Sequence, residues 1–399
     1  MSEAAADRPN RVLAIDAFRG LTILVMIFVN TLAGVRGMPS WLDHASAGAD
    51  GMTFPDVVFP AFLFIVGMSI PFAFAQRRAA GDNAWQLWRH VLGRTFGLLV
   101  LGVFMVNAED GYNEPAMGMS IHQWSLLFYG CALLVWAVYR RRGGGRLPPV
   151  AFVLRFVGAA GLLYLAWRFR GGPDGSLHLA PQWWGILGLI GWAYLYASAI
   201  FWLTGGRLLP LLLALTGCIA WYCVAHINNA PGTALAQLLA GQAENAVHTS
   251  IALCGLLTAR LFFGGPPALR FVHAPMFALA LAVVAFLLRP AYKISKIYAT
   301  PSWALYSAAI CVLLFAALYW LVDVRKQWRW TGLLAPVAAN PLLTYIIPYI
   351  VYAAMQALHL SLPEALGHGA AGLLWAVAYS CAVVALAAGL GRMGLKLQL

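Results

Sequence analysis

Residues 11–30 read RVLAIDAFRGLTILVMIFVN, and residues 51–71 read GMTFPDVVFPAFLFIVGMSIP. A membrane-spanning helix needs roughly 20 mainly apolar residues, and both stretches meet that requirement with few charges. The pattern extends through the chain, because 62% of the 399 residues are hydrophobic and only 10% are charged. Soluble domains contain about 25% charged residues. The composition therefore excludes a soluble globular fold and predicts an all-α polytopic membrane protein.

Apolar runs separated by charged, Gly or Pro clusters predict a bundle of about 10–12 transmembrane helices. We expect residues 1–10 to form a cytoplasmic N-terminal tail and residues 11–399 to form a single transmembrane domain. The tail has no apolar core, so we expect no cleaved signal peptide. The twelve expected spans are 12–33, 55–76, 90–107, 120–139, 147–167, 183–203, 208–225, 247–263, 270–289, 302–322, 331–355 and 369–389.

The basic residues predict the orientation of these spans. With the N-terminus in the cytoplasm, all but six of the 26 Lys and Arg fall on the cytoplasmic side, where such residues accumulate. They include Arg8, Arg11 and the basic run at 140–146. We therefore attribute the net charge of +12 to membrane orientation and expect no nucleic-acid partner. The six on the outer side are Arg36, Arg168, Arg170, Arg289, Lys293 and Lys296.

The cysteines predict neither disulfides nor a metal site. All six lie inside apolar stretches, and their spacing matches no metal-ligand motif. Small, weakly polar thiols in such positions usually serve packing. They are Cys131, Cys218, Cys223, Cys254, Cys311 and Cys381.

Polar residues inside apolar spans are costly and are therefore candidates for function. Asp16 and Arg19 are three residues apart, which places them on one helix face. They form either a local ion pair or a contact to an anionic ligand from the cytoplasm. Asn340, directly before Pro341, needs a hydrogen-bond partner in another helix, in water or in a ligand.

The loop after the first span combines polar groups that suit proton transfer. Asn30 ends the preceding helix, His44 lies in the loop, and Asp56 opens the next helix. Histidine titrates near neutral pH and can accept a proton from a hydroxyl or amine, and a nearby carboxylate can hold its tautomer. A solvated loop histidine is the alternative. Pro55, Pro60 and Pro71 predict a kinked or re-entrant second helix.

Two outer segments carry unusual charge. Glu109, Asp110 and Glu114 lie together without a basic residue, which is typical of a solvated loop but also suits attraction of a cationic amino sugar. Lys296 lies in a segment whose positive charges contradict the charge rule. We include Lys296 with Asp16, Arg19 and Asn340 as candidate cofactor-binding residues.

Together these motifs resemble the heparan-alpha-glucosaminide N-acetyltransferase family, in its bacterial transmembrane branch. The resemblance rests on RVLAIDAFRGLTILVMIFVN, a loop with DHA, and GMTFPDVVFPAFLFIVGMSI, followed by KIYATPSWALYS and ANPLLTY. It is most specific over residues 11–70. The segment SIHQWSLLFY, with His122 and Gln123, only loosely matches the corresponding family segment, and the loops around His44 are longer.

The resemblance implies an enzyme of the bacterial inner (cytoplasmic) membrane that moves an acetyl group from cytoplasmic acetyl-CoA to an amino sugar or other glycan in the periplasm. The family's active-site histidine falls on His44, and its neighbouring asparagine and aspartate fall on Asn30 and Asp56. Its Asp-x-x-Arg pair falls on Asp16 and Arg19, and its later asparagine on Asn340. It also suggests a homodimer. A direct transfer and an acetyl-histidine intermediate both remain open.

Two other function classes fit parts of the pattern. A secondary transporter or flippase for a glycan or lipid would explain the intramembrane Asp, Arg and Asn equally well. It would not explain a histidine and carboxylate beside a proline-rich helix at the outer face. The third class is a structural partner in a polysaccharide-assembly complex.

Overall fold

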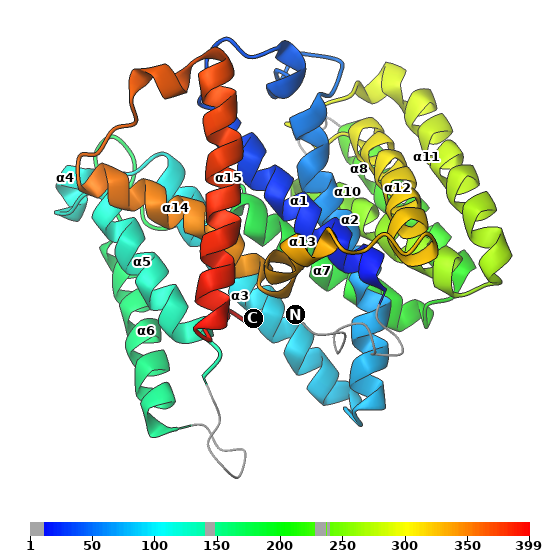
Figure 1. Ribbon diagram of the computed structural model, residues 1–399, viewed down its shortest axis with the longest axis horizontal. Helices are drawn as coiled ribbons and strands as arrows, with labels where there is room; N and C mark the ends of the chain where they lie inside the picture. Colours follow the sequence, from blue (N-terminus) through cyan, green and yellow to red (C-terminus); the bar gives the residue numbers. More distant parts are fainter. Residues whose placement is uncertain (1–11, 140–147, 228–236, 238–239) are drawn as a thin grey trace. The chain divides into compact units, whose positions relative to one another are not determined.

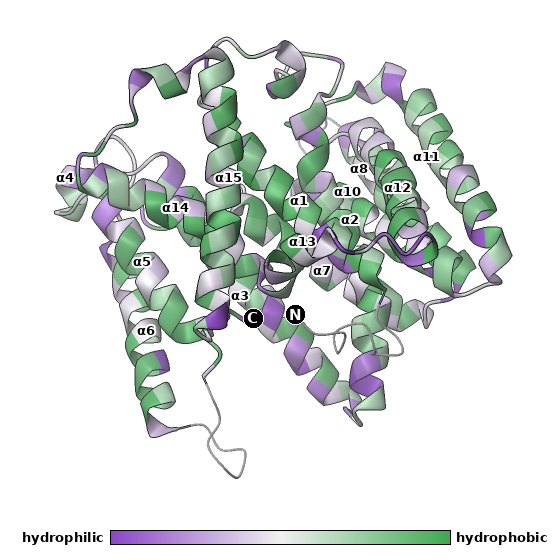
Figure 2. Cartoon of the chain, in the orientation of Figure 1, coloured by the Kyte–Doolittle hydropathy of each residue, from purple (hydrophilic) through white to green (hydrophobic). Residues whose placement is uncertain are grey.

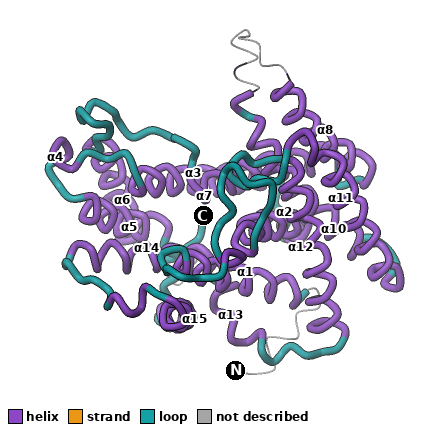
Figure 3. The backbone as a smooth tube through the Cα atoms, turned by 90° about the horizontal axis from the view of Figure 1, so that it is seen from above, coloured by secondary structure: helices purple, strands orange, loops and turns teal. Residues whose placement is uncertain are grey.

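A computed structural model describes residues 12–139, 148–227, 237 and 240–399 of the chain (Figure 1). Within these residues all regular secondary structure is helical (Figure 3), as expected. The predicted tail at 1–10 and the basic run at 140–146 lie outside the described residues. The long helices are α1 (Leu13–Leu32), α2 (Phe54–Ala79), α3 (Ala84–Glu109), α6 (Pro149–Arg168), α7 (Gly185–Thr204), α8 (Leu208–Ile227), α10 (Ala243–Phe263), α11 (Arg270–Tyr292), α12 (Pro301–Tyr319) and α15 (Gly369–Arg392).

Ten helices in the described parts are long and apolar enough to cross a membrane, or eleven if a broken pair counts as one span. This confirms the predicted class of an all-α polytopic membrane protein. Figure 2 shows hydrophobic residues along most of these helices and hydrophilic residues gathered at their ends and in the connecting loops. The cytoplasmic position of the N-terminus stays a prediction.

Two of the twelve expected spans differ from simple long helices. The expected span 120–139 is the shorter α5 (Ile121–Trp136), which ends where Ala137 adopts an extended backbone. The expected span 331–355 is two helices, α13 (Thr331–Ala339) and α14 (Pro341–Ala357). Asn340 interrupts them with φ −140° and ψ 58°, because a residue before proline is driven away from the helical region.

The chain divides into two compact units, and each contains segments far apart in sequence. The first comprises residues 1–26, 40–76 and 199–339, and the second comprises 27–39, 77–198 and 340–399. In the second unit, α5 packs against α3, α6 and α14. The buried indole of Trp124 donates to the carbonyl of Leu165 at 3.0 Å, which ties α5 to α6.

In the first unit, α10 is the central helix and packs against α8, α11 and α12. Helix α2 approaches α10 through two glycines. A Cβ added at Gly67 would overlap the carbonyl oxygen of Ala252, and one added at Gly255 would overlap that of Phe64. These glycines let the two backbones touch, which holds α2 in a fixed position against the core.

We predict that Gly67→Ala and Gly255→Ala each destabilise the protein by about 1–3 kcal/mol, because an added methyl group must push α2 away from α10. The thermal unfolding midpoint in detergent measures this effect. Gly217→Ala is the matched control, because Gly217 lies on α8 and an added Cβ meets nothing within 4 Å. An equal effect of all three changes would contradict the close helix contact.

Candidate functional site

The first unit contains a buried carboxylate in the first turn of α2. Asp56 has a relative exposure of 1%. One of its oxygens accepts from the backbone N–H groups of Ala45 at 3.1 Å and Thr53 at 3.0 Å. A carboxylate taken out of water is strongly destabilising unless donors surround it, so these two N–H groups fix the loop around Asp56.

The backbone carbonyl of Asp56 has a partner that the chain supplies from a distant helix. Pro60 has no N–H, so the carbonyl four residues earlier, that of Asp56, lacks its helical hydrogen bond. The indole N–H of Trp303 on α12 donates to this carbonyl at 3.0 Å, in a buried position. Helix α2 therefore continues without interruption from Phe54 through Pro60 and Pro71, and it does not begin with a re-entrant segment.

His44 meets the other oxygen of Asp56. The two are 2.7 Å apart, measured from Nδ1 to Oδ1. An ionised carboxylate only accepts hydrogen bonds, so Nδ1 carries the proton and Nε2 keeps its lone pair. The side chain of His44 is 40% exposed, whereas that of Asp56 is 1% exposed. The imidazole is thus partly open at the surface while the acid that orients it stays buried.

Lys296 joins this pair from the loop between α11 and α12. Its Nζ lies 3.2 and 3.4 Å from the two ring nitrogens of His44 and 3.9 Å from Oδ1 of Asp56. Burial of the ammonium lowers the pKa of Lys296, and the negative charge of Asp56 opposes that shift. Lys296 was expected as a cofactor contact, and in the first unit it lies against the histidine and the aspartate.

The loop that carries Lys296 is held in a strained shape. Lys293 and Ala299 have φ of 48° and 44°, a region that side chains other than glycine rarely adopt. The Thr300 hydroxyl accepts from the N–H of Ser295 at 3.0 Å and donates to the carbonyl of Lys293 at 3.1 Å, which closes the loop. Strain of this kind is common where a side chain must be held at a functional site.

Asp50, a second acid of the loop before α2, forms an ion pair with Arg289 at the end of α11. Asp50 accepts from Nε of Arg289 at 3.1 Å and from the N–H of Ile294 at 2.8 Å. The hydrogen bond from Ile294, the first of several causes, lowers the pKa of Asp50. Arg289 and Lys296, two of the basic residues predicted on the outer side, each have an acid of the segment 43–56 beside them.

Asp16 and Arg19 form the expected pair on α1. Their closest atoms are 3.2 Å apart, and both side chains are about one quarter exposed, at 24% and 25%. Arg19 also donates to the hydroxyl of Ser69 on α2 at 2.8 Å. The ion pair is therefore present, and part of the Arg19 side chain is exposed at the surface of the first unit.

Asn30 and Asn340 belong to the second unit. Asn30 is exposed near the end of α1. Asn340 is buried, donates to the carbonyl of Leu395 and accepts from the N–H of Leu397, both at 3.1 Å. Its amide therefore binds the backbone of the C-terminal segment. The contacts of Asn30 and Asn340 to substrate or cofactor stay predictions.

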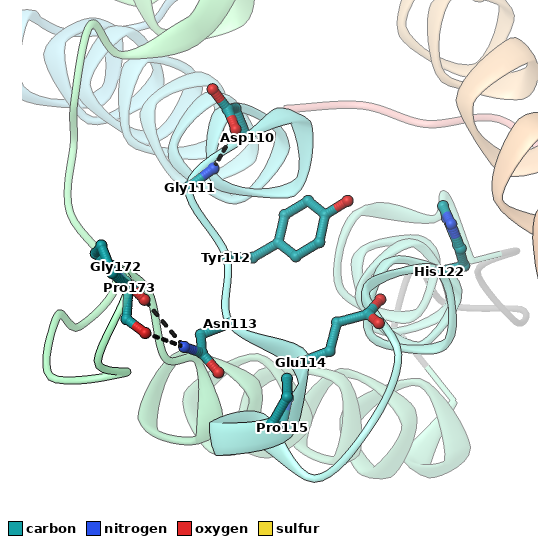
Figure 4. Close-up of a pocket in the computed structure, with 9 residues that line it drawn as sticks. All are labelled: Asp110, Gly111, Tyr112, Asn113, Glu114, Pro115, His122, Gly172 and Pro173. Carbon is teal, nitrogen blue, oxygen red and sulfur yellow. Dashed lines mark hydrogen bonds between the residues drawn. The ribbon is translucent and has the colours of Figure 1, made fainter.

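The acidic segment of the second unit that contains Asp110 and Glu114 lines a cleft of about 740 Å³. In Figure 4 the side chains of Tyr112 and Glu114 extend toward His122. Glu114 is already engaged, because it accepts from the N–H of Ile121 at 2.8 Å at the start of α5. Attraction of a cationic sugar to this loop stays a prediction. The described residues hold no group of three or more His, Cys, Asp or Glu placed to bind a metal.

Sequence reasoning missed Trp303 as a supporting residue. The only local signal is Pro60, whose missing N–H implies a free carbonyl four residues earlier. The donor is far away along the chain, 247 residues from Asp56. It also missed that Lys296 and His44 meet, because these residues are 252 positions apart.

The comparison with protein families decides the membership of the chain. Residues 11–226, just over half of the sequence, match the family described as "Domain of unknown function (DUF5009)". The chain belongs to this family. The matched region contains both the His44 loop and helix α2.

Two relatives share a shorter similarity with the chain. Heparan-alpha-glucosaminide N-acetyltransferase from Homo sapiens is 34% identical over 99 residues, which is 25% of this chain and 14% of the relative. The protein of the same description from Mus musculus is 34% identical over 105 residues, 26% of this chain and 15% of the relative. The expected resemblance is confirmed over about a quarter of the chain. The matched region spans about one-seventh of the length of these relatives.

We predict that Asp56→Asn lowers the pH at which Lys296 reacts with an amine-directed acylating reagent. Such reagents attack the neutral amine, and removal of the acid that opposes the lowered pKa of Lys296 increases its neutral fraction. Mass spectrometry of labelled peptides across pH measures the change. Asp43→Asn is the matched control, since Asp43 is an exposed acid of the same loop. Identical labelling profiles in the wild type and Asp56→Asn would contradict the contact.

Proposed function

We propose that this protein is a membrane-bound acetyltransferase that uses acetyl-CoA and acetylates an amino sugar or other glycan. The observation that carries the proposal is the contact between His44 and buried Asp56, which orients a half-exposed imidazole. Nε2 of this ring, which Lys296 approaches to 3.4 Å, is the proposed proton acceptor. The similarity to the heparan-alpha-glucosaminide N-acetyltransferases supports the choice of reaction.

In the proposed reaction, the amine or hydroxyl of the acceptor attacks the thioester carbonyl while its proton passes to Nε2 of His44. The tetrahedral intermediate then collapses and releases the CoA sulfur, which receives that proton. Asp56 holds the imidazole in the required tautomer and faces its positive charge during transfer. Asn30 is the proposed hydrogen-bond donor to the developing oxyanion. An acetyl group carried on Nε2 of His44 would use the same atoms in two steps.

We propose that the phosphates of the donor, acetyl-CoA, bind near Arg19 in the first unit. Ser69, the partner of Arg19, follows Asp56 by 13 positions on α2, which at about 1.5 Å per residue corresponds to roughly 20 Å. The pantetheine arm of CoA has a length of that order. Arg19 can therefore bind the phosphates of acetyl-CoA while the thioester reaches His44.

The proposed location follows from the predicted orientation. Acetyl-CoA would bind from the cytoplasm, and the acceptor would approach from the periplasm of a bacterial inner membrane. The chain would lie in the bilayer as a multi-pass protein, and we propose a homodimer on the basis of the family resemblance.

We predict that His44→Ala lowers acetyl transfer by roughly 10²–10⁴-fold, because the general base is lost. Free CoA thiol, released from acetyl-CoA in the presence of candidate amino sugars, measures the rate. His122→Ala is the matched control and retains its rate. Full activity of His44→Ala would exclude His44 as the base, and a transporter would release no CoA from any variant.

The same preparation separates chemistry from donor binding. His44→Ala binds acetyl-CoA with unchanged affinity, whereas Arg19→Ala loses affinity and the salt dependence of the residual binding decreases. Arg392→Ala, an exposed basic residue elsewhere in the chain, leaves binding unchanged. If Arg19→Ala folds and binds acetyl-CoA normally, Arg19 is only the ion-pair partner of Asp16.

A further inference from the structure

A small basic pocket lies in the second unit, where α2 ends and α3 begins. Its volume is about 320 Å³. Arg77 comes from the last turn of α2, and Arg89, His90 and Arg94 come from the first turns of α3. Leu399 also lines the pocket.

The positive charge of this pocket is only partly compensated. Arg77 pairs with Asp82 at 2.7 Å. The guanidinium of Arg94 lies over the ring of Tyr194, 4.8 Å from its centre, a contact that leaves its charge unpaired. Arg89 is exposed, and neither Arg89 nor Arg94 forms an ion pair with any described residue. Three guanidinium groups thus share one side-chain carboxylate.

The surroundings place this pocket near the surface of a bilayer. The side chain of Trp85, in the first turn of α3, is 70% exposed, and that of Phe96, three turns later, is 66% exposed. On an apolar helix, exposed aromatic side chains contact lipid, and tryptophans gather at the level of the lipid headgroups. The pocket therefore lies at a helix end where phosphate groups are concentrated.

We propose that this pocket binds a phosphate-bearing anion, with Arg89 and Arg94 as the principal contacts. Guanidinium groups bind phosphate through paired, charge-assisted hydrogen bonds, and two uncompensated guanidinium groups attract such a ligand. The phosphate comes either from the headgroup of an anionic phospholipid or from a free compound such as CoA. The proposal does not depend on acetyl transfer.

The test measures binding with the full-length protein purified in detergent. Phosphatidylglycerol in mixed micelles, CoA and inorganic pyrophosphate are each titrated, and native mass spectrometry and the thermal unfolding midpoint report binding. We expect Arg89→Gln to weaken binding of whichever of these three ligands occupies the pocket by about tenfold or more. This is the effect of losing one charge-assisted contact. Because Arg89 is exposed, this variant folds. Arg89→Lys, which keeps the charge, loses less.

The arms of the experiment distinguish the two sources. Binding of phosphatidylglycerol that Arg89→Gln weakens identifies a lipid headgroup. Binding of CoA that pyrophosphate displaces and that Arg89→Gln weakens identifies a free phosphate compound at this pocket and not at Arg19. Arg392→Gln is the matched control and binds as the wild type does. Equal affinities in wild type and Arg89→Gln for all three ligands, or an equal loss in Arg392→Gln, would overturn the proposal. Acetyl transfer is not measured, so failure here is distinct from failure of the proposed enzyme.

Discussion

The burial of one carboxylate, that of Asp56, determines how the first unit is built around its polar centre. A charge this far from water must be compensated by donors, and the chain supplies them from the loop before α2 and from the loop before α12. The N–H groups of Ala45 and Thr53, Nδ1 of His44 and the ammonium of Lys296 all lie around it. Each of these contacts requires the loops to adopt the shape observed.

The rest of the first unit supports the same centre. Gly67 and Gly255 let α2 lie against α10, and Trp303 binds the carbonyl that Pro60 leaves without a helical partner. Asp50 ties the first loop to the end of α11 through Ile294. A loop connected in this way at both ends can hold a histidine in one orientation, which is what a general base requires.

Most of the helical content could be predicted from the sequence, because hydrophobic runs of spanning length are a strong signal. The interruption at Asn340 was not predicted, although the following proline disfavours a helix there. Asn30, His44 and Asp56 were named from their residue types and positions, and the family resemblance then assigned them site roles. The contacts from Lys296 and Trp303 could not be predicted, because they join positions far apart in sequence and follow no periodic pattern.

The central claim is that His44 and Asp56 act as one unit in proton transfer. A double-mutant cycle of His44→Ala and Asp56→Asn, measured as the rate of CoA release with a saturating acceptor, tests this most directly. The account predicts that Asp56→Asn lowers the rate in the wild type but has almost no further effect once His44 is alanine. Rate losses that multiply in the double variant would contradict the account, because Asp56 would then act independently of His44.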